Sequence, residues 1–195
     1  FMHNGQIGGF SGLRRRIENM IPDRCYPHRR GATDSEAIFL IALGEVDDEG
    51  PVEATRRALV RIVAEMEAAG VTEPLRFAAA MTDGRTLTVF RWSSDPQAPS
   101  VWFRRSAGGL VVVSEPIDDQ ADGWQAVGAN HVLVASCGEA SDPPVIVPFE
   151  LEPAVPGSTA DGPGMARPWA RSVGREAVEQ ARPAGTAQGL VAAAA

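Results

Sequence analysis

Two residues at the start of the sequence, Asn4 and Gly5, could do chemistry. They close a short apolar stretch, Phe1–Asn4, which stops at Gly5 as the end of a strand does. An asparagine carboxamide and the unobstructed N–H of a glycine are two donors that together can hold the oxyanion formed in acyl transfer. Asn-Gly is also typical of a plain turn. On the dipeptide alone, the turn is the favoured interpretation.

A second candidate stretch, Gly31–Glu36, has the pattern of a helix start. Thr33 and Glu36 have capping-box spacing, in which the hydroxyl and the carboxylate reciprocally accept hydrogen bonds from free backbone amides. Asp34 lies between them, and the helix dipole stabilises an acid at this position without any ligand. This motif alone therefore does not indicate a binding site.

The cysteines and histidines indicate no metal centre. Two cysteines are too few for a metal cluster, and the three histidines lie far apart without metal-ligand spacing. Cys25 and Cys137 are predicted to be free thiols. Cys25 with His28 is the one candidate nucleophile pair, in a loop rich in proline and arginine. An ordinary surface-loop cysteine is the favoured interpretation.

The composition narrows the class of protein further. The 195 residues contain 25 acidic and 18 basic side chains, so a nucleic acid or an anionic membrane is not expected as a partner. Every basic residue is an arginine, which removes lysine chemistry such as Schiff bases and the phosphate-loop lysine. No apolar run is long enough to span a bilayer, and no secretory signal is recognised. We predict a cytoplasmic protein with a small-molecule substrate and no cofactor; a homo-oligomer stays open.

Helical periods give way to strand periods along the chain. Apolar spacing predicts three helices: one ending before Pro22, one from Thr33 to Gly44, and one from Pro51 to Gly70. Further on, alternation predicts a hairpin around Asp83-Gly84 and then more short strands. The expected strands are 75–81, 86–92, 101–105, 110–114, 131–135 and 145–150. The order favours an α+β fold with helices layered on sheet.

The composition shifts near residue 152. Residues 153–195 are rich in Pro, Gly and Ala, and their large apolar residues are sparse and aperiodic. Such a segment cannot bury enough surface to offset its ordering entropy. We therefore predict a globular domain over 1–152 and a disordered tail over 153–195.

The order and spacing of the first two motifs are more specific than either motif alone. They resemble class II glutamine amidotransferases, which are N-terminal-nucleophile hydrolases, and among these the small stand-alone YafJ-type and ergothioneine-pathway members. The resemblance covers residues 1 to about 150. The matching stretches are His3–Gln6, Gly31–Glu36, Thr82–Gly84, Val112–Pro116 and Trp124–Val127.

The resemblance implies a four-layer α/β/β/α sandwich that hydrolyses the side-chain amide of glutamine to glutamate and ammonia. It implies that Asn4 and Gly5 form the oxyanion hole. It also implies that Asp34 receives the α-ammonium group of the substrate, as a carboxylate in a confined site does. No chemical role is implied for His3, for which packing is expected.

One departure from the family concerns the nucleophile, which in these enzymes is a cysteine at the mature N-terminus. This sequence begins at Phe1, inside the first motif, and phenylalanine has no nucleophilic atom. We therefore expect it to be the C-terminal part of the domain, with a partial sandwich and no activity by itself. Two alternatives stay open: a γ-glutamyl amide hydrolase of the ergothioneine kind, and a non-catalytic binding domain of the same fold.

Overall fold

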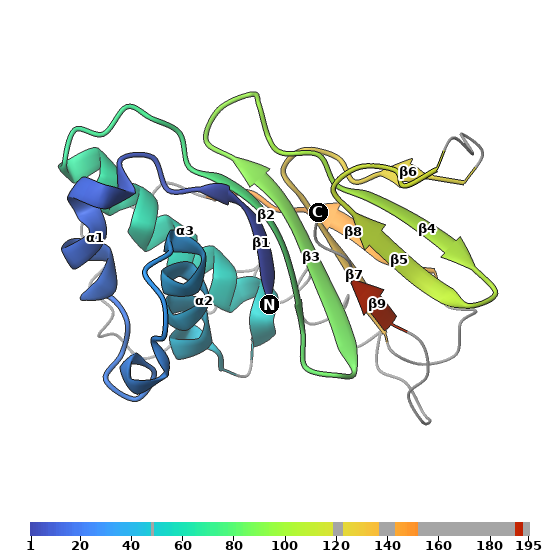
Figure 1. Ribbon diagram of the computed structural model, residues 1–195, viewed down its shortest axis with the longest axis horizontal. Coiled ribbons are helices and arrows are strands. Elements are labelled where there is room, and N and C mark those ends of the chain that lie inside the picture. The colour runs from blue at the N-terminus through green and yellow to red at the C-terminus, as the bar shows by residue number, and fades with distance from the viewer. Residues whose placement is uncertain (48, 119–122, 137–142, 152–189, 193–195) are drawn as a thin grey trace, which may run out of the picture. The chain divides into compact units, whose positions relative to one another are not determined.

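The computed structural model describes residues 1–47, 49–118, 123–136, 143–151 and 190–192 (Figure 1). These residues form two compact units. The sheet unit takes its described residues from 1–8, 73–149 and 181–195, and the helical unit takes them from 9–72 and 150–180.

The helical unit contains three α-helices, α1 (Phe10–Glu18), α2 (Asp34–Glu45) and α3 (Gly50–Ala68), and a short 3-10 helix over Tyr26–His28. Thr33 caps α2, and Pro51 lies in the first turn of α3, as the sequence predicts. The first helix is shorter than expected. The N–H groups of Met20 and Ile21 bond to carbonyls three residues back, so the chain tightens out of the α-helix before Pro22.

The helices of this unit bury small and branched side chains. Ala37, Ile38 and Ile41 of α2 and Ala58 and Leu59 of α3 are fully buried. The one buried polar residue of α3, Thr55, donates its hydroxyl to the Pro51 carbonyl at 2.8 Å, so its oxygen is satisfied within the helix.

A close approach in this unit explains one glycine. A Cβ built on Gly44 of α2 would lie 2.7 Å from Cδ of Pro22, and closer still to its Cγ. The glycine therefore lets the helix and the proline ring meet. At the surface, Arg16 of α1 pairs with Glu65 of α3 at 2.8 Å. Exposed pairs of this kind add little stability.

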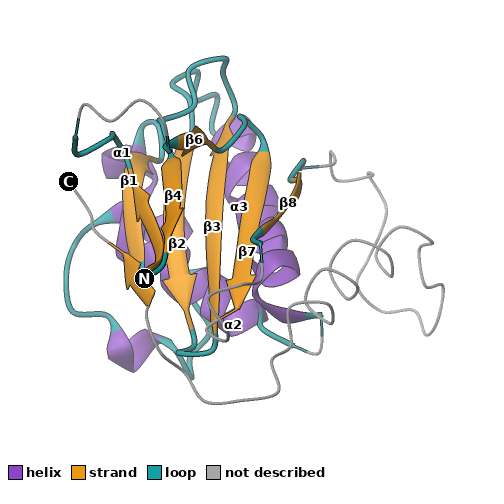
Figure 2. Ribbon diagram, turned by 90° about the vertical axis from the view of Figure 1, so that its right-hand side faces the viewer, coloured by secondary structure: helices purple, strands orange, loops and turns teal. Residues whose placement is uncertain are grey.

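The sheet unit contains two sheets. Sheet A has the strand order β1-β2-β3-β7-β8, and each neighbouring pair is antiparallel (Figure 2). Its strands are β1 (Met2–Gln6), β2 (Arg76–Thr82), β3 (Thr86–Ser93), β7 (His131–Ser136) and β8 (Val145–Pro148). Sheet B has the order β6-β4-β5-β9, with strands β4 (Trp102–Ser106), β5 (Gly109–Val113), β6 (Gln125–Ala126) and β9 (Leu190–Ala192).

The predicted hairpin is confirmed between β2 and β3. Oδ1 of Asp83 accepts hydrogen bonds from the N–H groups of Arg85 and Thr86, each at 2.8 Å. Gly84 has φ +86°, a conformation that glycine adopts without strain. Burial alone would raise the pKa of Asp83, but the two backbone N–H groups outweigh it and lower that pKa.

Sheets A and B pack face to face over one apolar core. This core takes its side chains alternately from the strands of both sheets, as the period of two requires. Its buried residues are Ala78, Leu87, Val89, Val101, Phe103, Val112, Val127, Leu133 and Ala135. On the opposite face of sheet A, Phe90 packs between Phe77 and Phe149, with ring centroids 5.7 and 5.0 Å away and ring planes inclined by 50° and 67°. The expected mixture of helices and antiparallel sheet is therefore confirmed.

Two short strands are not predicted by the sequence. β6 pairs with β4, and β9 runs parallel to β5. β9 falls in the segment 153–195, so the expectation of disorder does not hold at Leu190–Ala192. The other residues of that segment lie outside the described part of the chain, and disorder there stays a prediction. None of the helices in the described ranges is long and apolar enough to cross a membrane.

Candidate active site

Asn4 and Gly5 lie inside a strand and not in a turn. The prediction of a strand that stops at Gly5 is wrong, because β1 continues to Gln6, with Gly5 opposite Phe77 and Gln6 opposite Arg76 of β2. The turn interpretation of the dipeptide is wrong for the same reason. Within sheet A, β1 is an edge strand that pairs with β2 alone among the described strands.

The Asn4 side chain is available for a ligand. Asn4 lies opposite Ala78, on the face of sheet A that also carries the core shared with sheet B. The residue is exposed, and its carboxamide makes no hydrogen bond to any residue that the structure describes. Its two N–H donors are therefore free to bind a ligand oxygen.

Gly5 stands at a position that only glycine fits. Its φ of +151° lies in a region that other residues avoid. A Cβ built there would lie 2.7 Å from the carbonyl carbon of Arg76 and 2.8 Å from Nε2 of His3. Gly5 is also exposed, so no side chain of its own separates its backbone from a ligand.

Asp34 begins α2 in the helical unit. The hydroxyl of Thr33 accepts the N–H of Glu36 at 3.3 Å, which is one half of the predicted capping box. Oδ1 of Asp34 accepts the N–H of Ser35 at 2.8 Å, and the residue is half-buried. The carboxylate is thus oriented by the backbone at the positive end of the helix.

The other half of the capping box differs from the prediction. The Glu36 carboxylate does not reach Thr33; it accepts the N–H groups of Arg30 and Gly31, each at 2.7 Å. These amides, with the charge of Arg29 added, hold the pKa of Glu36 below its ordinary value. The chain turns back just before α2, and this turn brings the backbone amides of Arg30 and Gly31 within hydrogen-bonding distance of the Glu36 carboxylate.

Arg29 ties the loop before Asp34 to α1. Its buried guanidinium donates to Glu18 at 2.6 Å, to Glu36 at 3.3 Å and to the carbonyl of Thr33 at 2.9 Å. Burial alone would raise the pKa of Glu18, but the hydrogen bonds from Arg14 and Arg29 lower it below its ordinary value. The sequence does not identify Arg29 as part of this arrangement, because nothing in it shows that Arg29 lies between Glu18 and Glu36.

The alternative nucleophile pair is not assembled. Cys25 is only 5% exposed, so the expectation of a surface-loop cysteine is wrong. His28 donates its backbone N–H to the Cys25 carbonyl at 3.0 Å, but the thiol bonds to no described residue. Cys137 lies outside the described residues. Among those described, no three His, Cys, Asp or Glu side chains are grouped to hold a metal ion.

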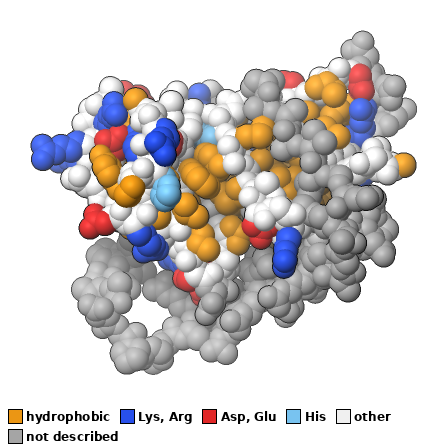
Figure 3. Space-filling model, turned by 60° about the horizontal axis from the view of Figure 1, so that its bottom comes forward, with side chains coloured by type: hydrophobic (Ala, Val, Ile, Leu, Met, Phe, Trp, Pro, Cys, Tyr) orange, Lys and Arg blue, Asp and Glu red, His pale blue; other side chains and the backbone are white. Residues whose placement is uncertain are grey.

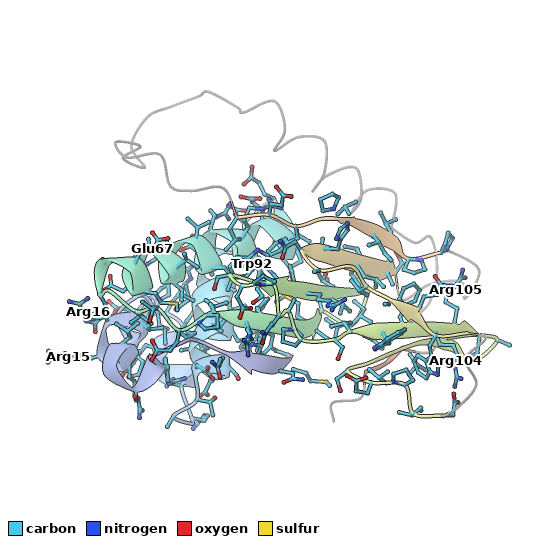
Figure 4. All side chains as sticks on the ribbon, turned by 90° about the horizontal axis from the view of Figure 1, so that it is seen from above. Arg15, Arg16, Glu67, Trp92, Arg104 and Arg105 are labelled. Carbon is cyan, nitrogen blue, oxygen red and sulfur yellow. The ribbon has the colours of Figure 1, made fainter. Side chains whose placement is uncertain are left out.

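One group of charged side chains outside these positions, around Arg104, stabilises local structure. On the face shown in Figure 3, acidic and basic groups are interspersed. On β4, Arg104 (labelled in Figure 4) donates to both oxygens of Asp118 at 2.8 and 3.0 Å, with its guanidinium 4.4 Å from the Trp124 ring. Asp118 also accepts the indole N–H of Trp124 at 2.9 Å. These contacts hold the segment before β6 against β4.

Known proteins that are similar to this chain include one curated protein and one solved structure. A probable glutamine amidotransferase of Saccharomyces cerevisiae, DUG3, is 30% identical over 174 residues, covering 68% of this chain and 48% of DUG3. This chain therefore spans about half the length of that curated relative. No family model matches the sequence.

This chain is also similar to a solved structure. A glutamine aminotransferase class-II domain protein from Silicibacter pomeroyi is 35% identical, with a TM-score of 0.69, over 77% of this chain and 67% of that one. At this sequence identity and coverage, the similarity indicates a shared family as well as a shared fold. This chain belongs to the glutamine amidotransferase family.

Proposed function

We propose that the full-length protein hydrolyses the side-chain amide of glutamine to glutamate and ammonia. Asn4 and Gly5 are the oxyanion hole in this proposal, and Asp34 accepts the α-ammonium group of the substrate. The observation that carries it is the pair on β1: an exposed carboxamide without a partner among the described residues, next to a backbone that only glycine permits.

The nucleophile in this proposal is a cysteine outside this sequence. Its thiolate attacks the amide carbon, the C–N bond breaks, and the nitrogen leaves as ammonia after gaining a proton. Water then cleaves the thioester, which releases glutamate and restores the thiol. In both steps the carbonyl oxygen becomes negative, and the two donors at Asn4 and Gly5 stabilise that charge.

The fold proposed for this activity is the four-layer sandwich of N-terminal-nucleophile hydrolases. The two stacked sheets of the sheet unit are its inner layers. Support comes from the packing of sheets A and B face to face over one apolar core. The absence of a cofactor and a cytoplasmic location are further parts of this proposal.

Kinetics of the full-length protein with L-glutamine test the site. We expect Asn4→Ala to lower kcat by roughly 10²–10³, as the loss of one oxyanion donor does. We expect Asp34→Asn mainly to raise KM, because the ammonium that it binds does not react. Asn19→Ala and Asp23→Asn are matched controls at exposed positions in the helical unit. Full activity of Asn4→Ala would contradict the oxyanion role.

The choice of substrates separates the remaining alternatives. The same proteins are assayed with L-glutamine and with a larger γ-glutamyl amide, L-γ-glutamyl-p-nitroanilide. Turnover of glutamine that depends on Asn4 supports the proposal. Turnover of the larger amide alone indicates a γ-glutamyl hydrolase, and binding without turnover of either indicates a binding domain.

A further inference from the structure

The imidazole of His3 lies directly beside Gly5. The two residues are separated by one position on β1, so their side-chain directions share a face of the strand. The ring packs on Phe77, with centroids 5.1 Å apart and planes inclined by 37°. Its Nε2 atom is 3.3 Å from the carbonyl oxygen of Arg76.

That same carbonyl encloses Gly5 from the neighbouring strand. A Cβ at Gly5 would lie 2.7 Å from the Arg76 carbonyl carbon and 2.8 Å from Nε2 of His3, so both groups border the Gly5 Cα. The Arg76 carbonyl and the His3 ring therefore form the two sides of one space, and they are joined to each other by a hydrogen bond. Because a carbonyl only accepts, Nε2 carries the proton in this bond.

Arg76 is itself held in place at the end of β2. Its guanidinium donates to Asp95 at 2.7 Å and to Gln97 at 3.1 Å. Asp95 also accepts the hydroxyl of Ser93 at 2.6 Å, and Ser93 lies opposite Arg76 on β3. The hydrogen bond from Arg76, followed by that from Ser93, keeps the pKa of Asp95 well below its ordinary value, so the carboxylate stays ionised.

We propose that His3 is a positioning residue for Gly5. Its Nε2–H bond to the Arg76 carbonyl and its ring beside the glycine hold the Gly5 backbone in one conformation. This role rests on the proposed function, in which the Gly5 N–H binds the oxyanion. Glycine has more backbone freedom than any other residue, and an oxyanion donor is effective only when it is already oriented before the reaction. Because β1 lies at the edge of sheet A, pairing with β2 orders the Gly5 backbone from one side, and His3 restricts the Gly5 backbone further.

Three variants separate the hydrogen bond from the packing. His3→Phe keeps a ring against Phe77 and removes the donor, whereas His3→Gln keeps an N–H donor and removes the ring. We expect His3→Phe to lower kcat of the full-length protein by about 10-fold or more, with KM for L-glutamine within about twofold. We expect His3→Gln to restore most of that loss. Phe149→Leu is the packing control, because this fully buried ring packs on Phe90 at the other end of sheet A from β1; it should lower the melting temperature and leave kcat unchanged.

Nuclear magnetic resonance gives readouts independent of activity. We expect the Gly5 amide resonance to shift or broaden in His3→Phe and to stay close to wild type in His3→Gln. In the wild-type protein, the imidazole nitrogen shifts of His3 should show the Nε2–H tautomer at neutral pH. This last measurement needs no variant and therefore decides the hydrogen bond even if His3→Phe does not fold.

Each result points to one conclusion. Wild-type kcat in His3→Phe, equal slowing in His3→Phe and His3→Gln, or a neutral His3 protonated at Nδ1 would overturn the positioning role. If Asn4→Ala retains full glutamine hydrolysis, the proposed function fails instead. In that case the Gly5 resonance still reports whether His3 orders the glycine.

Discussion

Replacement of Gly5 by alanine tests the geometry of β1 most directly. The added Cβ would meet the Arg76 carbonyl carbon at 2.7 Å, with the carbonyl oxygen closer still. Carbon atoms normally make contact at roughly 3.5–4.0 Å. Since the obstacle is backbone of the paired strand and not the end of a flexible side chain, rotation of a side chain cannot relieve the overlap.

The expected effect is a large loss of stability. Forcing an extra carbon into a filled space costs about 1–3 kcal/mol, and an unfavourable backbone conformation, here φ +151°, costs about 1–3 kcal/mol more. Because β1 is a five-residue edge strand, part of the strain can be released by separation from β2. We therefore expect a loss of about 2–4 kcal/mol in the free energy of unfolding.

Urea unfolding, followed by circular dichroism, measures this loss. Gly12→Ala is the matched control, because Gly12 lies in α1, where an added Cβ would meet no atom within 4 Å outside the neighbouring backbone of its own helix. Alanine is the better helix former, so the control should gain about 0.5–1 kcal/mol. If Gly5→Ala is as stable as wild type, or gains as Gly12→Ala does, the close approach of β1 and Arg76 is refuted.

Three further changes test other parts of the structure. Gly44→Ala would place a Cβ 2.7 Å from Cδ of Pro22, so we expect a loss of about 1–3 kcal/mol in urea unfolding despite the gain in helix propensity. Phe90→Ala removes a fully buried ring and should lower the calorimetrically measured stability by about 3–5 kcal/mol. The N–H of Arg30 and further contacts hold the pKa of Glu36 below its ordinary value of 4.5. The ionised carboxylate therefore adds to the free energy of unfolding above pH 4.5, and this stabilisation is lost as the pH falls through the lowered pKa. Glu36→Gln should therefore flatten the decline of the urea midpoint in acid, and an unchanged decline would contradict this.

Features set by neighbouring residues could be predicted from the sequence. The cap of α2 at Thr33, the start of α3 at Pro51 and the hairpin at Asp83-Gly84 each depend on contacts within a few positions. The helix and strand periods likewise located most elements, because the period shows how each segment buries its apolar side. Asn4 and Gly5 were recognised as candidates from their types and spacing.

What the same residues do in space depended on distant partners. The sequence does not show that β1 pairs with β2, seventy-three positions away at the His3–Arg76 contact, so the dipeptide looked like a turn. Nor does it show that Glu36 binds the amides of Arg30 and Gly31, or that Cys25 is buried. Strand register and loop closure result from many weak contacts summed over the whole chain, and no local pattern contains that sum. The tertiary structure therefore decided that Gly5 must be glycine, because its limiting neighbour is a carbonyl on another strand.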